Sequence, residues 1–278
     1  MTHPALSDGR VAVITGAASG IGRATAHALS LRGMRVVLVD CNGDGLRETA
    51  ASLDGPSLVR EMDVANRDAV EELAATCFGE FGQVHFLMNN AAIRVAGSDD
   101  ESLENWHRTM AINFWSAVYA ERAFLPRMID GGAPGVILNT GSKQGITNPP
   151  GNVIYNVTKS ALKTYTEQLQ HRLRMIDGCL ITAHLLVPGF TITGPHKPDP
   201  GGWMPEELVE YMLPRLERGD FYITCPDNEV TLELDAKRMA WATHDIIDNR
   251  PPLSRWHPDW AAAFEAQLQP QLSCDRGG

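Results

Sequence analysis

Tyr155, Lys159 and Ser142 are the side chains in this sequence best suited to acid–base chemistry. Tyr155 and Lys159 are four positions apart, so on a helix both project from one face. A phenol has an ordinary pKa of about 10, too high for a base at neutral pH, but a nearby cation lowers it. Ser142 lies 13 residues before Tyr155, and its hydroxyl can hold a substrate oxygen on which charge develops. The set therefore indicates proton transfer to and from an alcohol or carbonyl oxygen.

A glycine-rich stretch at residues 15–22, TGAASGIG, lies between an apolar run and a helical pattern. Its glycines permit a tight turn and close backbone approach, and the helix N-terminus that follows offers N–H groups and a positive dipole end to a pyrophosphate. Asp40 ends the next apolar run, 18 residues after Gly22. A carboxylate there can accept hydrogen bonds from both hydroxyls of an adenosine ribose and repels a 2′-phosphate. The alternative is that Asp40 caps the next helix or is only solvated.

The residues around Asp40 bear on which dinucleotide fits. Positions 41 and 42 carry no Lys or Arg, and residue 19 is Ser. The sequence therefore predicts NAD as the cofactor, with NADP disfavoured.

The hydrophobic pattern predicts the scaffold that positions these residues. Fully apolar strands that alternate with helices are typical of a parallel sheet covered on both faces. We therefore expect an α/β, doubly wound, Rossmann-type fold of about seven strands, with helices on both faces and a C-terminal helical extension. The expected strands are 11–15, 35–40, 58–62, 84–88, 136–139, 180–187 and 221–224, and the expected helices are 22–32, 43–53, 68–81, 103–128 and 152–176.

One of these helices, 103–128, carries an apolar pattern that we place on or near one face: Leu103, Trp106, Met110, Ala117, Phe124 and Met128.

The pattern weakens after Pro188. Residues 194–205 are rich in Pro and Gly, which predicts a loop, and 206–218 reads as a helix interrupted at Pro214. Amphipathic spacing predicts further helices at 232–247 and 259–268. We expect one Rossmann-type domain over residues 1–278, made of a cofactor-binding and catalytic core at 10–193, a substrate loop, helix and last strand at 194–224, and the C-terminal helical extension at 225–278.

Several motifs in this order resemble the short-chain dehydrogenase/reductase family over roughly residues 10–193. A lone Tyr-x-x-x-Lys is common by chance, whereas the ordered set is specific. The matching features are TGAASGIG at 15–22, Asp63-Val64, Asn89-Asn90-Ala91-Ala92 with Ala in place of the usual last Gly, Asn113, Ser142, Tyr155 with Lys159, and the stretch Pro188–Thr193.

The resemblance implies a role for each matched residue. Tyr155 acts as the acid–base group, Ser142 holds the substrate oxygen, Lys159 also binds the nicotinamide ribose, and Asn113 holds a water that links Lys159 to solvent. Asn113 as a helix-kink residue and Asp63 as a turn residue remain open alternatives. The residues expected to bind the cofactor are Gly16, Ser19, Gly20, Ile21, Gly22, Asp40, Asp63, Val64, Asn90, Ala91, Tyr155, Lys159, Pro188, Gly189, Thr191 and Thr193.

Residues next to these motifs are candidates for the substrate pocket. Aromatic side chains suit a hydrophobic, cyclic or aromatic alcohol. Arg94 and Lys143 could instead bind a carboxylate or be solvated surface charges. Trp203 either forms a pocket wall or packs as a lid residue on the following helix. The full set of candidates is Arg94, Lys143, Gln144, Asn148, Phe190 and Trp203.

The activity that follows is an NAD-dependent oxidoreductase that interconverts a secondary alcohol and a ketone. The alternative is a non-catalytic NAD(H)-binding redox-sensing module, which would need none of the catalytic residues Asn113, Ser142, Tyr155 and Lys159. A dehalogenase- or lyase-like relative is disfavoured because the glycine-rich loop and Lys159 are intact.

Composition limits the partners. The chain has 278 residues, a net charge of −10 and 44% hydrophobic residues, which argues for a folded protein with a small-molecule substrate and against nucleic acid or an anionic membrane. The five cysteines form no Cys-x-x-Cys pair, so we expect no metal, free thiols and a cytoplasmic location. The helices at 103–128 and 152–176 resemble the family's interface helices, which implies a homodimer or homotetramer.

Overall fold

A parallel sheet of seven strands organises the molecule, in the order β3-β2-β1-β4-β5-β6-β7. The computed structural model describes residues 3–94, 102–193 and 199–268. The strand order reverses between β1 and β4, and in open α/β sheets ligands bind outside the carboxyl ends of the strands at such a point. The expected Rossmann-type fold is therefore confirmed. The strands are β1 (Val11–Thr15), β2 (Arg35–Asp40), β3 (Ser57–Glu61), β4 (Phe86–Asn89), β5 (Gly135–Thr140), β6 (Ile181–Val187) and β7 (Tyr222–Thr224).

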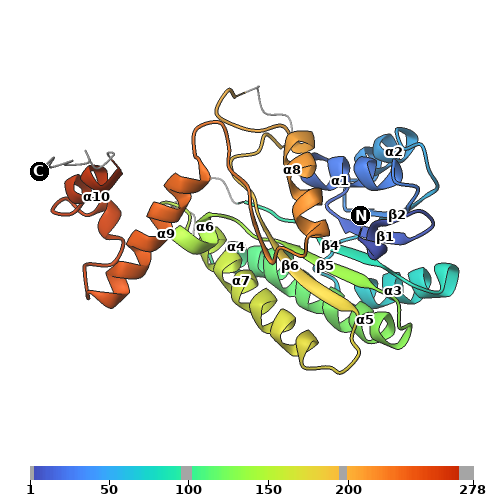
Figure 1. Ribbon diagram of the computed structural model, residues 1–278. Helices are drawn as coiled ribbons and strands as arrows, with labels where there is room; N and C mark the ends of the chain where they lie inside the picture. Colours follow the sequence, from blue (N-terminus) through green and yellow to red (C-terminus); the bar gives the residue numbers. More distant parts are fainter. Residues whose placement is uncertain (1–2, 95–101, 194–198, 269–278) are drawn as a thin grey trace, which may run out of the picture.

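Helices cover both faces of this sheet (Figure 1). Side chains alternate along each strand, so in β1 Ala12 and Ile14 join the core on one face while Val11 and Val13 join the core on the other. The first face carries α1 (Gly20–Ser30), α2 (Gly43–Ala51) and α8 (Pro205–Glu217), and the second carries α3 (Arg67–Phe81), α5 (Ser116–Asp130) and α7 (Val153–Arg174).

The helix expected at 103–128 is three elements. These are α4 (Leu103–Met110), a π-helical turn η2 (Ala111–Trp115) and α5. The expected single apolar stripe is wrong at its beginning, because Leu103 is 74% exposed whereas Phe124 and Met128 are buried. The sequence pattern did not indicate the extra residue that the π turn introduces.

The break expected at Pro214 is also wrong, because α8 continues through it. A proline in a helix removes only one backbone donor, and here the ring lies on the exposed side of α8. Met212, Leu213 and Leu216 are buried against the core and hold the helix together on either side. Tertiary packing has overridden the local preference.

The chain ends in a helical extension made of α9 (Leu232–Ile247), the short turn η3 (Ser254–Trp256) and α10 (Ala261–Leu268). Figure 1 shows it projecting to one side of the sheet, with α9 beside α6 (Gln144–Thr147). Its small core is aromatic: the Trp241 ring lies 5.3 Å from Phe264 and 6.5 Å from Trp260, and Trp241 Nε1 donates to Ser254 Oγ at 2.7 Å. None of the helices in the described segments combines the length and hydropathy needed to cross a bilayer.

Candidate active site

A chain of hydrogen bonds joins the carboxyl ends of β1, β4 and β5 to α7. Asn90 donates from its backbone N–H to Thr15 Oγ1 at 2.9 Å and from Nδ2 to the Thr15 carbonyl at 3.1 Å. Thr140 Oγ1 donates to Asn90 Oδ1 at 3.2 Å, and Lys159 Nζ donates to the Thr140 carbonyl at 2.7 Å. The glycine-rich loop that follows Thr15 is thereby held in a fixed relation to Lys159.

At Gly20 and Gly22, the glycine-rich loop has no room for a side chain. A Cβ on Gly22 would lie 2.1 Å from the Gly16 carbonyl oxygen, and a Cβ on Gly20 would lie 2.9 Å from Thr193 Cγ2. Ser19 stands at the N-cap of α1 without capping the helix through its side chain. This backbone cradle at a helix N-terminus fits a pyrophosphate.

Asp40 faces the same loop from the end of β2. Its Oδ2 accepts the Ala18 N–H at 3.1 Å and its Oδ1 accepts the Asn42 N–H at 3.0 Å. Asn42, not Asp40, caps α2, by accepting the Gly45 N–H at 3.0 Å. The Asp40 carboxylate therefore does not cap α2.

Asp63 is both a turn residue and an ion-pair partner. Its Oδ1 accepts the Ala65 N–H at 2.9 Å, and its Oδ2 accepts from Arg108 of α4 at 2.7 Å. Burial raises the pKa of Asp63, but these two donors together hold it below its ordinary value. The next residue, Val64, is buried against the core formed with α3 and α5. The sequence reading missed Arg108, which lies 45 residues from Asp63.

Asn113 lies in the π turn η2 and is 2% exposed. Its Oδ1 accepts the Ile93 N–H at 2.8 Å, and its Nδ2 donates to the Ile93 carbonyl at 2.9 Å and to Thr158 Oγ1 at 3.2 Å. Both functional groups of the amide are thus used, and the side chain contacts α7 at the residue before Lys159. Asn113 therefore lies in the π turn and also forms the hydrogen bond that joins this turn to α7.

The catalytic candidates meet between the end of β5 and α7. Ser142 Oγ accepts the Gln144 N–H at 3.1 Å, and its hydroxyl acts on the Tyr155 phenol to lower its pKa. The ammonium of Lys159 lies 5.6 Å from the centre of the Tyr155 ring, and the guanidinium of Arg94 lies 5.9 Å from it. The ring of Tyr155 thus has two cations and the Ser142 hydroxyl as neighbours.

Burial acts in opposite directions on these two groups. It lowers the pKa of Lys159 to about 8, because a charged ammonium is poorly solvated there. Burial also raises the pKa of Tyr155, although the hydrogen bond with Ser142 and the charge of Arg94 partly offset this. The lowering expected for Tyr155 from Lys159 is therefore not found in the protein alone, and Arg94 is the cation that acts on it.

Four of the expected substrate-pocket residues, Arg94, Gln144, Asn148 and Phe190, lie in segments that adjoin the proposed catalytic residues or the segment after β6. Arg94 and Phe190 are exposed, and Gln144 begins α6 directly after the Ser142 turn. Asn148 ends α6 with a φ of 45°, and its Oδ1 accepts from Asn156 Nδ2 at 3.1 Å. Part of the expected loop, 194–198, lies outside the described residues.

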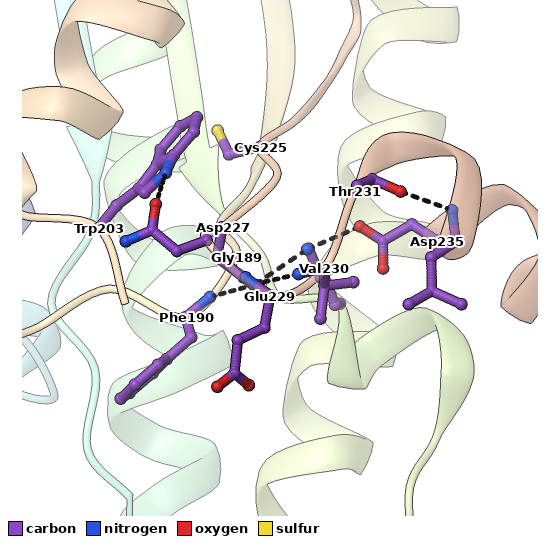
Figure 2. A network of polar contacts seen from close by, with 12 residues as sticks. Gly189, Phe190, Trp203, Cys225, Asp227, Glu229, Val230, Thr231 and Asp235 are labelled. Carbon is purple, nitrogen blue, oxygen red and sulfur yellow. Dashed lines mark hydrogen bonds and ion pairs between the residues drawn. The ribbon is translucent and has the colours of Figure 1, made fainter. Parts of the chain in front are cut away.

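Two of the substrate candidates have other partners. The ammonium of Lys143 lies between the carboxylates of Asp227 and Asp235, and its side chain is 14% exposed, so it is not a solvated surface charge. Trp203 packs edge-on against Tyr211 of α8 at 5.4 Å between ring centres, which is the contact with the following helix that one of the two alternatives for this residue expects. Its Nε1 donates to Asn228 Oδ1 at 3.1 Å (Figure 2).

No motif indicated Asp227 or Asp235. Asp227 lies 84 residues from Lys143, and only its place after the strand β7 could have drawn attention to it. The described residues contain no group of three or more His, Cys, Asp and Glu side chains arranged to hold a metal.

Comparison with known proteins supports the geometry. The profile of the short chain dehydrogenase family matches residues 10–199. The chain belongs to this family. Among solved structures, a short chain dehydrogenase/reductase from Burkholderia phymatum in complex with NAD is similar, with a TM-score of 0.78 and 28% identity over 88% of this chain and 96% of that one.

Two curated proteins are similar to this chain in sequence. A putative oxidoreductase SadH of Mycobacterium tuberculosis is 39% identical over 170 residues, 60% of this chain and 61% of the relative. A 1-deoxy-11-beta-hydroxypentalenate dehydrogenase of Streptomyces avermitilis is 35% identical over 184 residues, 64% of this chain and 67% of the relative. The match thus spans about three fifths of the length of the first of these relatives.

Proposed function

We propose that this short chain dehydrogenase is an NAD-dependent oxidoreductase that interconverts a secondary alcohol and a ketone. The observation that carries the proposal is the pairing of Ser142 with Tyr155 beside Lys159, next to a glycine cradle that fits a pyrophosphate. Proton transfer at an alcohol oxygen needs a base and a group that holds the oxygen, and these side chains supply both.

Bound nicotinamide supplies the hydride acceptor or donor. Tyr155 takes the hydroxyl proton of the alcohol, or returns it to the ketone oxygen in the reverse direction. Ser142 donates a hydrogen bond to the same oxygen and stabilises the charge that develops on it. Arg94 favours the phenolate through its charge, and the Thr140 carbonyl fixes the ammonium of Lys159 close to the Tyr155 ring. Asn113 orients this end of α7 through Thr158.

The substitution Tyr155→Phe tests the proposal. It removes only the hydroxyl, so we expect turnover to fall by roughly a thousandfold or more while the dissociation constant for NADH changes by less than about threefold. The measurement is the absorbance of NADH during incubation of NAD with aryl, cyclic, aliphatic and polyol secondary alcohols.

The matched control is Tyr222→Phe, which removes the hydroxyl of an exposed tyrosine that bonds Glu167. It should leave turnover within about twofold of the unaltered protein. If Tyr155→Phe kept its turnover, or if the unaltered protein bound NADH but oxidised no alcohol in the panel, the catalytic proposal would fail and the redox-sensing alternative would stand.

NAD is the proposed cofactor in preference to NADP. Each oxygen of the Asp40 carboxylate accepts one backbone N–H and can accept a further hydrogen bond from a ribose hydroxyl, and its negative charge repels a 2′-phosphate. We expect Asp40→Ala to lower the ratio of kcat/KM with NAD to kcat/KM with NADP by about tenfold or more. Asp44→Ala is the control, because Asp44 is exposed on α2, where it forms an ion pair with Arg47 at 2.5 Å. An unchanged ratio in Asp40→Ala would refute the preference.

The proposed substrate is hydrophobic, and cyclic or aromatic. The exposed side chain of Phe190, in the segment next to the site, favours an apolar molecule. Higher turnover of polyols than of cyclic or aryl carbinols in the same panel would contradict this class. We further propose a homo-oligomer, and a cytoplasmic location that agrees with the four free thiols of the described residues.

A further inference from the structure

Lys143 is an unusual residue to find directly after a proposed catalytic serine. Its side chain is 14% exposed, and its ammonium lies 2.6 Å from Asp235 Oδ2 and 3.3 Å from Asp227 Oδ2. The two carboxylate side chains are 3% and 4% exposed, respectively. Taking three charged groups out of water is costly, so their removal from solvent is compensated only by close and well-ordered pairing.

The backbone of Lys143 belongs to the Ser142 turn. Its carbonyl accepts the Ile146 and Thr147 N–H groups, both at 3.0 Å, and so begins α6. The hydrogen bond from Gln144 N–H to Ser142 Oγ spans the same residue. A displacement of the Lys143 side chain therefore displaces the turn that carries the Ser142 hydroxyl.

Asp227 connects this lysine to the opposite side of the site. The carboxylate oxygen that faces Lys143 also accepts the Phe190 N–H at 2.9 Å, and the other oxygen accepts the Glu229 and Val230 N–H groups at 3.1 and 2.7 Å (Figure 2). Gly189 packs directly on this residue, since a Cβ there would lie 2.8 Å from Asp227 Oδ2. Asp227 thus holds the segment Pro188–Phe190, which follows β6.

Asp235 supplies the second carboxylate from the first turn of α9. Its backbone N–H bonds the Thr231 carbonyl at 3.0 Å, so its position is set by the start of the C-terminal extension. It pairs with Lys143, whereas Asp227 also holds Phe190. The two carboxylates therefore differ in what they connect.

We propose that Lys143 and Asp227 are positioning residues that hold the Ser142 turn and the Pro188–Phe190 segment at a fixed separation. This inference rests on the proposed function for its kinetic consequence. The Ser142 turn carries the group proposed to hold the substrate oxygen, and the segment after β6 contains Pro188 and Gly189, which are expected to bind the cofactor. Errors of about 1 Å in such geometry cost roughly a hundredfold in rate.

The kinetic test compares Lys143→Met, Asp227→Asn and Asp235→Asn. We expect kcat to fall by roughly tenfold to a hundredfold in the first two variants, with the dissociation constant for NADH within about threefold. Asp235→Asn should keep kcat within about threefold, because the ion pair of Lys143 with Asp227 and the Phe190 bond remain. The double variant of Lys143→Met and Asp227→Asn should lose no more than the worse single variant, since the two act as one unit.

The matched control is Arg32→Met. Arg32 and Glu217 form an ion pair of 2.6 Å whose side chains are 27% and 21% exposed, and it joins the turn after α1 to the end of α8. Its loss should lower the melting temperature without changing kcat by more than about twofold. Equal kcat losses in the control and in Lys143→Met would overturn the positioning role, as would an unchanged kcat in a folded Asp227→Asn.

Hydrogen exchange of the protein without cofactor provides a readout that needs no activity. Gly141 N–H bonds the Leu186 carbonyl at 2.7 Å and Gly145 N–H bonds the Ser142 carbonyl at 3.0 Å, while Phe190 N–H bonds Asp227. Lys143→Met should raise exchange in peptides that cover 140–147 and 188–193 together, and Arg32→Met in neither. A rise confined to one segment would overturn the coupling, whereas absence of alcohol turnover in the unaltered protein would overturn only the proposed function.

Discussion

At the scale of single residues, burial disfavours the charged forms of both Lys159 and Tyr155. The ammonium has a pKa lowered to about 8, whereas that of the phenol is raised above its ordinary value, although Ser142 and Arg94 act to lower it. Tyr155 is the base of the proposed reaction only in its deprotonated form, so a bound nicotinamide cation has to favour the phenolate.

A pH dependence follows from these shifts. We expect kcat/KM for alcohol oxidation to rise about tenfold per pH unit at low pH and to level off as Tyr155 loses its proton. The midpoint should lie below the raised pKa that Tyr155 has in the protein alone, because a bound nicotinamide cation favours the phenolate. Initial rates at low alcohol concentration across the pH range give the profile, and a kcat/KM that falls as the pH rises would show that Tyr155 is not the base.

The proposed catalytic residues could be found in the sequence because each belongs to a local motif. Tyr155 and Lys159 share one helix face, and Ser142 closely follows a fully buried strand that begins with an apolar run. The environment of Lys143 could not be found this way, since its two carboxylate partners come from the segment after β7 and from α9. From the sequence alone, a lysine next to the proposed catalytic serine is interpreted as a substrate ligand, because its acidic partners lie far along the chain.

At the scale of elements, the strands and the amphipathic helices were the most predictable parts. The predicted bounds of β1, β2 and α9 agree with the structure, because apolar runs and amphipathic spacing are local signals. The turns η2 and α6 were not predicted. Their conformations depend on contacts with residues far along the chain, such as the bonds of Asn113 with Ile93 and Thr158.

The proline within α8 gives a prediction for stability. Pro214→Ala should raise the free energy of unfolding by about 1 kcal/mol, because the restored N–H and the relief of the ring outweigh the freer unfolded chain. Pro205→Ala should lower it by about 1 kcal/mol, since Pro205 is buried at the first position of the same helix, where proline is favoured. Urea unfolding measures both, and a loss of stability in Pro214→Ala would contradict the account.

At the scale of the whole molecule, apolar side chains are exposed to solvent on the helices of the second face, which carries α3, α5 and α7. Trp115 of η2 is 45% exposed, and Val153 and Val157 are exposed one turn apart on α7. These helices are neighbours, and Trp115 stacks on Tyr119 at 6.1 Å between ring centres, which holds it in place. Exposed apolar side chains gathered on rigid helices are typical of a contact surface between subunits.

The proposed oligomer can be tested at this surface. We expect Trp115→Glu to reduce the mass measured by light scattering to that of a single chain, because a buried, unpaired carboxylate would oppose association. Leu31→Glu is the control, since Leu31 is exposed at the end of α1 on the other face of the sheet. An unaltered chain that already scatters as a monomer would refute the oligomer, and an unaffected mass in Trp115→Glu would refute this surface.

The π turn η2 has a consequence for how the chain aligns with its relatives. One residue more than an α-helix would use rotates everything before Ala111 by about 100° relative to α5. The apolar stripe of α4 is thus out of phase with that of α5, which explains why Leu103 points to solvent although it continues the spacing of Phe124 and Met128. Deleting a single residue between Ala111 and Trp115 would bring the two stripes into phase and turn Asn113 away from Ile93. In sequence alignments, a gap at these positions would therefore mark a relative in which this asparagine does not reach α7.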